Sequence, residues 1–157
     1  LIYSLGLKKV PVVELFVVAA FYVLRLAGGG ILAGVEVSIW LYLIIFSGSL
    51  LFVCGKRLTE KRNSNTRFVL QYYSEKMLFW LLLFCAAASC IFIFFFSLNQ
   101  GLLYLPQAII FSLAIARYVY LVEKTARGES MKILFDKMMV LLIGIFILYT
   151  VLIIYLI

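Results

Sequence analysis

Long apolar runs alternate with short polar stretches along this chain, and the polar stretches are of two kinds. Nearly all the Lys and Arg residues lie in three of them, at 8–9, 56–76 and 124–137. The links between these stretches, around residues 35–37 and 97–101, carry one Glu and no Lys or Arg. Such alternation is typical of helices that cross a membrane repeatedly and keep their cations on one side.

Five apolar runs are close to the ~20 residues that a helix needs to cross a bilayer. The pattern therefore predicts an all-α, polytopic membrane helix bundle with five transmembrane helices. No low-complexity or Gly/Ser-rich linker divides the chain, so we expect one membrane domain. The predicted spans are about 12–34, 38–54, 77–96, 102–122 and 138–157.

Charge and composition refine this prediction. The chain is 66% hydrophobic and 13% charged, which leaves too little polar surface for a soluble domain. Residues 55–76 hold six cations against two carboxylates, a net +4, and residues 123–137 hold four against three, a net +1. The positive-inside bias predicts a cell (inner) membrane protein with both loops and the active face cytoplasmic. Anionic membrane lipids then account for the total charge of +7, and no nucleic-acid partner is expected.

The sequence contains no histidine, which excludes Ser–His and Cys–His nucleophiles and His-ligated zinc. Cys54, Cys85 and Cys90 lie in apolar runs without a C-x-x-C spacing, so we expect small buried residues.

Charged residues inside the first span are candidates for function. Glu14 and Arg25 are eleven residues apart, close to three helical turns, so they share one face about 16 Å apart. Facing lipid would be costly for Arg25, and we expect it to face the bundle interior or a wet cavity. The alternatives are a structural Arg bonded to backbone carbonyls and an Arg that extends its charge to the far interface. Gly30 and Gly34 follow, and their spacing favours close helix packing.

A charged cluster follows the second span. On a helical continuation, Glu60 lies one turn from both Lys56 and Arg57. One carboxylate between cations at a membrane face suits a diphosphate with its divalent metal, and a solvated salt-bridge cluster is the simpler alternative. The loop at 55–76, which includes Arg67 and Tyr73, is amphipathic and predicts a short helix at the interface, capped near Asn63–Asn65.

Two further charges have simple explanations. Arg117 lies about one turn from the cytoplasmic end of its span, where it can extend its charge to the interface. Asp136 is the only Asp in the chain, and a local pair with Lys137 is expected.

These motifs, in this order, resemble the UbiA superfamily of intramembrane prenyltransferases, and most closely the branch containing decaprenyl-phosphate phosphoribosyltransferase. The resemblance covers the whole chain, as the last five of the family's nine helices. It rests on Tyr3-Ser4-x-x-Leu7-Lys8, Glu14, Leu24-Arg25-x-x-Gly28, Gly55-Lys56-Arg57-x-x-Glu60, Arg67-x-x-Leu70-x-x-Tyr73, Arg117-Tyr118, Arg127-Gly128-Glu129 and Asp136-Lys137.

The resemblance implies a transferase that moves phosphoribose from phosphoribosyl pyrophosphate to a polyprenyl phosphate. Its catalytic residues here would be Lys56, Arg57 and Glu60, with Glu60 also a Mg²⁺ ligand. The substrate-binding residues would be Tyr3, Lys8, Glu14, Arg25, Arg67 and Tyr73.

The chain departs from the family pattern in two places. Glu14 stands where the family usually has Asp. The family's first Asp-rich motif, which is the main Mg²⁺ site and binds the diphosphate, is absent. The chain is therefore expected to supply about half an active site, and a separate N-terminal half is a candidate partner.

Three other functions fit the sequence. One is an aromatic prenyltransferase of the same family, which uses a polyprenyl diphosphate as donor. The others are a transporter module, with Glu14 and Arg25 in its pathway, and a non-catalytic membrane subunit that packs through Gly and Ala faces.

Overall fold

The structure is a computed structural model that describes residues 11–62, 74–124 and 136–156. Every regular element in these ranges is helical. Five helices are long and apolar enough to cross a membrane, which confirms the predicted polytopic all-α bundle. The elements are α2 (Pro11–Ala33), α3 (Ile39–Arg62), α4 (Glu75–Gln100), η3 (Leu102–Tyr104), α5 (Leu105–Lys124) and α7 (Lys137–Leu156).

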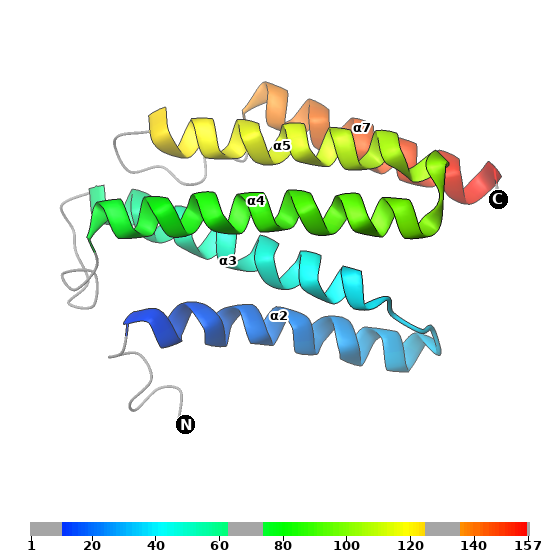
Figure 1. Cartoon of the computed structure of the whole chain (residues 1–157), viewed down its shortest axis with the longest axis horizontal. Helices are drawn as coiled ribbons and strands as arrows, with labels where there is room; N and C mark the ends of the chain where they lie inside the picture. Colours follow the sequence, from blue (N-terminus) through cyan, green and yellow to red (C-terminus); the bar gives the residue numbers. More distant parts are fainter. Residues whose placement is uncertain (1–10, 63–73, 125–135, 157) are drawn as a thin grey trace.

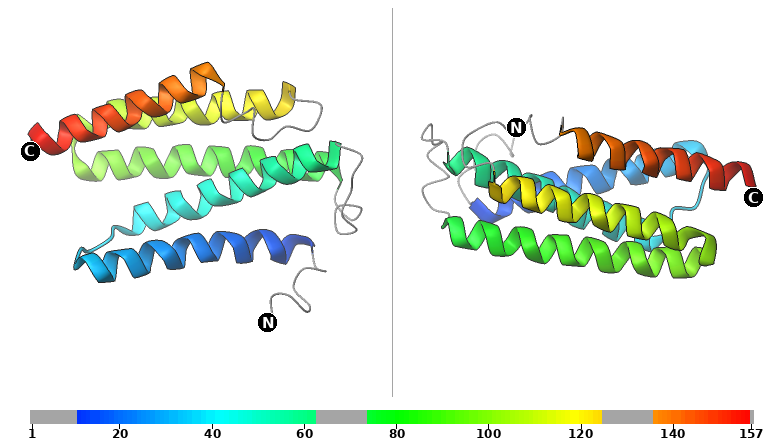
Figure 2. Two further views of the ribbon diagram at one scale, coloured as in Figure 1. Left: turned by 180° about the vertical axis from the view of Figure 1, so that it is seen from behind. Right: turned by 90° about the horizontal axis from the view of Figure 1, so that it is seen from above.

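The long helices run up and down, and each packs mainly against the next one along the chain (Figure 1). The helices α2 and α7 therefore lie at opposite edges of the bundle, with α4 between α3 and α5. The two further views show the same lengthwise arrangement of all five helices (Figure 2). The C-terminal ends of α3 and α5 and the N-terminal ends of α2 and α4 lie at one end, which we call the charged end, and α7 begins a little further along the bundle (Figure 1).

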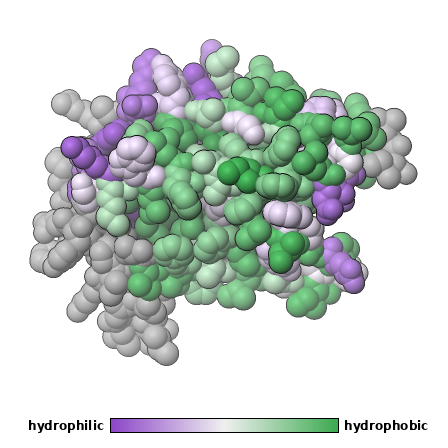
Figure 3. Space-filling view, viewed as in Figure 1, coloured by the Kyte–Doolittle hydropathy of each residue, from purple (hydrophilic) through white to green (hydrophobic). Residues whose placement is uncertain are grey.

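Hydropathy follows this arrangement. The middle of the visible face is mostly hydrophobic, and hydrophilic residues gather near the helix ends, most of them at the charged end (Figure 3). The spans predicted from the sequence match the observed helices to within a few residues, except for the second. The helix α3 continues eight residues past the predicted boundary at Cys54 and ends at Arg62. This extension carries Lys56, Arg57 and Glu60 on a helix, as the sequence predicted.

The main core lies mostly between α3, α4 and α5, with smaller contributions from α2 and α7. Leu51, Leu58 and Leu82 are almost completely buried there. Cys54 and Cys85 are buried and free, as predicted, whereas Cys90 is only half-buried.

A polar contact also joins α3 to α4. The hydroxyls of Ser47 and Ser89 are hydrogen-bonded at 2.9 Å. Small hydroxyl residues of this kind allow membrane helices to approach closely and hydrogen-bond across their interface.

The glycines of α2 differ from the prediction. Gly34 does not pack a neighbouring helix but ends α2, with φ +65°. Its N–H donates to the carbonyl of Ile31 at 3.2 Å, and the N–H of Val35 donates to the carbonyl of Gly30 at 3.0 Å. These two bonds form a Schellman motif, in which glycine adopts the left-handed conformation at little cost.

Candidate functional site

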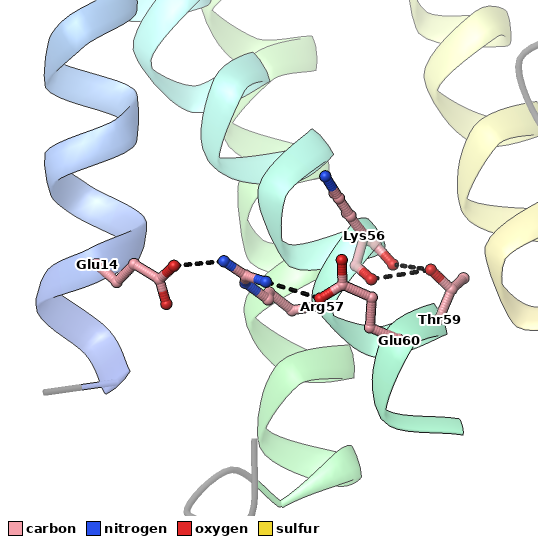
Figure 4. A network of polar contacts seen from close by, with 6 residues as sticks. Glu14, Lys56, Arg57, Thr59 and Glu60 are labelled. Atoms are coloured by element: carbon pink, nitrogen blue, oxygen red, sulfur yellow. Dashed lines mark hydrogen bonds and ion pairs between the residues drawn. The ribbon is translucent and has the colours of Figure 1, made fainter. Parts of the chain in front are cut away.

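The candidate site lies at the charged end, where Arg57 of α3 bridges two carboxylates. Its guanidinium donates to Glu60, one turn later on the same helix, at 2.7 Å. It also donates to Glu14 of α2, 43 residues earlier in the chain. Glu14 points toward Arg57 across the space between the two helices (Figure 4). We call Glu14, Arg57 and Glu60 the carboxylate–arginine cluster.

The cluster is largely shielded from water. The side chains of Glu14 and Arg57 are each 11% exposed, and that of Glu60 is 27% exposed. Charges in such surroundings interact more strongly than in bulk water, and each depends on its partner. The guanidinium fork suits this role because it can donate to two carboxylates at once in a fixed geometry. The cluster carries a net charge of −1.

Lys56 lies beside the cluster but takes no part in it. Its side chain points away from Arg57 (Figure 4), is exposed and forms no ion pair with any described residue. The backbone carbonyl of Lys56 accepts a hydrogen bond of 2.9 Å from the hydroxyl of Thr59. Lys56 therefore offers a cation that no described carboxylate neutralises.

An apolar groove of about 540 Å³ leads away from these two cations along α3. Val18 and Tyr22 of α2 form one side, and Phe111 of α5 lies on the other. Lys56 and Arg57 are its charged lining residues, and the rest of the lining is mostly aliphatic and aromatic. This combination fits an amphiphile that has a hydrocarbon tail and an anionic head.

Of the remaining predicted site residues, only Arg25 is among those that the structure describes. Tyr3, Lys8, Arg67 and Tyr73 are outside the described residues, as is the predicted interfacial helix. Arg25 is exposed on the surface of α2 and does not face the interior of the described bundle.

Sequence reasoning missed how the helix ends are joined. Asp136 does not pair with Lys137 but accepts two hydrogen bonds from Arg117, at 3.0 and 3.2 Å. Arg62 of α3 donates to the backbone carbonyls of Val122 and Glu123 at 3.0 and 3.1 Å. Arg62 thus satisfies carbonyls that the last turn of α5 leaves without helical partners. No sequence spacing indicates this contact, because the two segments are about sixty residues apart.

Gly55 was also missed as a packing residue. A Cβ atom at this position would collide with the hydroxyl of Tyr118 on α5. Tyr118 is 6% exposed and belongs to the main core. Gly55 therefore allows α5 to pack closely against α3 just before Lys56 and Arg57.

The chain is similar to several curated proteins, all named decaprenyl-phosphate phosphoribosyltransferase. It is 33% identical over 138 residues to the one from Mycobacterium tuberculosis strain H37Rv, covering 82% of this chain and 46% of the relative. It is 31% identical over 128 residues to the Corynebacterium glutamicum protein, covering 74% of this chain and 39% of the relative. For Mycolicibacterium smegmatis the identity is 28% over 151 residues, covering 85% and 48%.

The chain thus spans less than half the length of these relatives. No protein-family model matches it. The matches nevertheless cover 74% to 85% of the chain. The chain is therefore a homologue of proteins named decaprenyl-phosphate phosphoribosyltransferase, which confirms the resemblance found in its sequence.

Proposed function

We propose that the chain binds a polyprenyl phosphate and takes part in transferring phosphoribose to it from phosphoribosyl pyrophosphate. The observation that carries this proposal is the apolar groove with Lys56 and Arg57 in its lining. The similarity to decaprenyl-phosphate phosphoribosyltransferases supports the same substrates.

The groove would bind the tail of the lipid, and the cations would bind its phosphate. The isoprenoid tail lies along the groove, where each buried methylene contributes about 0.8 kcal/mol. The phosphate lies at the charged end, with Lys56 as its first partner because no described carboxylate neutralises it. A phosphate oxygen of the lipid then bonds to the anomeric carbon of ribose, and the bond from that carbon to pyrophosphate breaks.

Arg57 would hold the cluster together and neutralise part of its negative charge. Both ends of its guanidinium fork bind carboxylates, so Arg57 fixes Glu14 and Glu60 in place. When pyrophosphate leaves, Lys56, the cation that no described carboxylate neutralises, would stabilise the developing negative charge.

Magnesium fits the cluster only as an ion that the carboxylates share with substrate phosphates. Mg²⁺ is usually held by one or two carboxylates together with substrate phosphates and water, and Glu14 and Glu60 supply two carboxylates. The described residues contain no group of three or more possible ligands, so substrate phosphates would complete its coordination. When bound there, the ion would neutralise charge on the pyrophosphate.

The charged end would face the cytoplasm. The described residues at that end include Lys56, Lys61, Arg62, Lys76 and Lys124. The links at the opposite end, 34–38 and 101, contain no cation, which is the asymmetry expected of a cytoplasmic face in a cell membrane.

The test is a comparison of lipid binding by the purified chain in nanodiscs. Decaprenyl phosphate should bind at least tenfold more tightly than decaprenol, which has the same tail without the phosphate. Lys56→Ala should remove most of this difference, because Lys56 is the first partner of the phosphate. A tenfold difference in affinity corresponds to about 1.4 kcal/mol. Lys61→Ala is the matched control, since Lys61 is on the same helix but does not line the groove. Equal affinity for the two lipids would contradict the proposal and favour a non-catalytic membrane subunit.

A further inference from the structure

A second apolar cavity lies next to the groove. It has a volume of about 160 Å³ and is lined by residues of α3, α5 and α7. Leu51, Ala114, Leu142 and Phe146 line it, and none of them lines the groove. The reaction proposed above does not use this cavity.

Three residues line both spaces: Gly48, Phe52 and Phe111. The ring of Phe52 packs edge-on against the ring of Tyr118, with centroids 5.0 Å apart. The ring of Phe111 lies 5.9 Å from that of Phe146. These contacts hold both aromatic walls in place between the groove and the cavity.

Gly48 leaves space between these walls. A Cβ atom added to Gly48 would meet no atom within 4 Å, outside its own helix and chain neighbours. Any larger side chain there would extend into the region that the two spaces share. Gly48 also precedes Lys56 by eight residues, which places it about 12 Å along the helix from the charged end.

We infer that the tail of the polyprenyl phosphate passes Gly48 into the second cavity, so that Gly48 and Ala114 select for lipids with long tails. This inference rests on the proposed function. The occupant is a hydrocarbon chain with an anionic head, because both spaces are apolar and their cations, Lys56 and Arg57, line the groove alone.

Volumes separate short tails from long ones. An apolar cavity of about 150 Å³ holds a benzene-sized molecule, or roughly 25 Å³ for each carbon. The ten carbons of geranyl phosphate then need about 250 Å³ by the same ratio, and the groove offers about 540 Å³. A decaprenyl tail is far larger than the groove and must continue elsewhere. The second cavity has room for about one isoprene unit, and the rest of the tail would continue into the bilayer.

The experiment measures binding of radiolabelled decaprenyl phosphate and geranyl phosphate to the purified chain in nanodiscs. Gly48→Leu closes the shared region, and Ala114→Leu fills the second cavity alone. Gly144→Leu is the matched control, because a Cβ at Gly144 also meets nothing within 4 Å but Gly144 lines neither space. The melting temperature of each variant verifies that it is folded.

We expect Gly48→Leu and Ala114→Leu to weaken decaprenyl phosphate binding at least fivefold. Ala114→Leu, which does not change the lining of the groove, should leave geranyl phosphate binding within twofold of wild type. Gly144→Leu should change neither. The inference is overturned if folded Gly48→Leu and Ala114→Leu bind decaprenyl phosphate as wild type does, or if Ala114→Leu weakens binding of both lipids equally. If the wild-type chain binds neither lipid, the proposed function itself fails, which is a distinguishable result.

Discussion

Replacing Arg57 by Met should destabilise the bundle strongly, because it removes the shared partner of two shielded carboxylates. Met keeps much of the side-chain volume but cannot donate to Glu14 or Glu60. Removing one member of a buried ion pair typically costs 3 to 5 kcal/mol. Because Glu60 is 27% exposed and can rehydrate, we expect a loss near the lower limit, about 3 kcal/mol.

A second substitution separates the part of this loss in stability that comes from the unpaired charge of Glu14. Glu14→Gln in the Arg57→Met background removes the more deeply shielded of the two unpaired charges. The double variant should therefore regain about 1 to 2 kcal/mol relative to Arg57→Met alone, although it contains one more substitution. Recovery of this kind is not expected if Arg57 contributes only packing.

The assay is reversible unfolding of the purified chain by SDS in mixed micelles, followed by circular dichroism. Lys61→Met is the control, since it removes one cation from the same helix without breaking an ion pair between described residues. It should change the free energy of unfolding by no more than about 0.5 kcal/mol. If Arg57→Met is as stable as Lys61→Met, the cluster does not hold α2 against α3, and our reading of its geometry is wrong.

Two further predictions concern packing and topology. Gly55→Ala should destabilise the bundle by about 1 to 3 kcal/mol, since the added methyl collides with Tyr118. Gly144→Ala, which meets open space, should be neutral or stabilising by up to about 1 kcal/mol in the same unfolding assay. Single cysteines at the exposed positions Ser74 and Asn99, in a background without the three native ones, should differ in intact cells. An impermeant maleimide should label position 99 and not position 74, and the reverse pattern would invert the proposed orientation.

The fold was largely predictable because each span leaves a long apolar run with a charged stretch at one of its ends. Hydropathy also predicted which helix ends meet. Hydropathy could not predict that α3 continues to Arg62. The last two turns are polar, so hydropathy does not distinguish them from a loop. The helical spacing of Arg57 and Glu60 was the signal that the extension existed.

The site was only partly predictable. The pair of Arg57 and Glu60 follows from helical spacing, whereas the bond from Arg57 to Glu14 joins residues 43 positions apart. Charge counting identified both as candidates but could not bring them together. The contacts made by Gly55, Arg62 and Asp136 depend on which helices are neighbours and how they are rotated, and hydrophobic periodicity is weak in helices that are apolar on every side.

The most direct test of the account is transfer of radiolabelled phosphoribose to decaprenyl phosphate, in membranes from cells that express this chain together with an N-terminal half that carries the Asp-rich motif. Our account predicts Mg²⁺-dependent formation of labelled lipid from phosphoribosyl pyrophosphate. Arg57→Lys, which keeps the charge but loses the two-carboxylate fork, should lower turnover at least tenfold, or about 1.4 kcal/mol of transition-state stabilisation. Lys61→Met should stay within twofold of wild type. Wild-type turnover in Arg57→Lys, or no labelled lipid from the wild-type protein, would contradict the central claim.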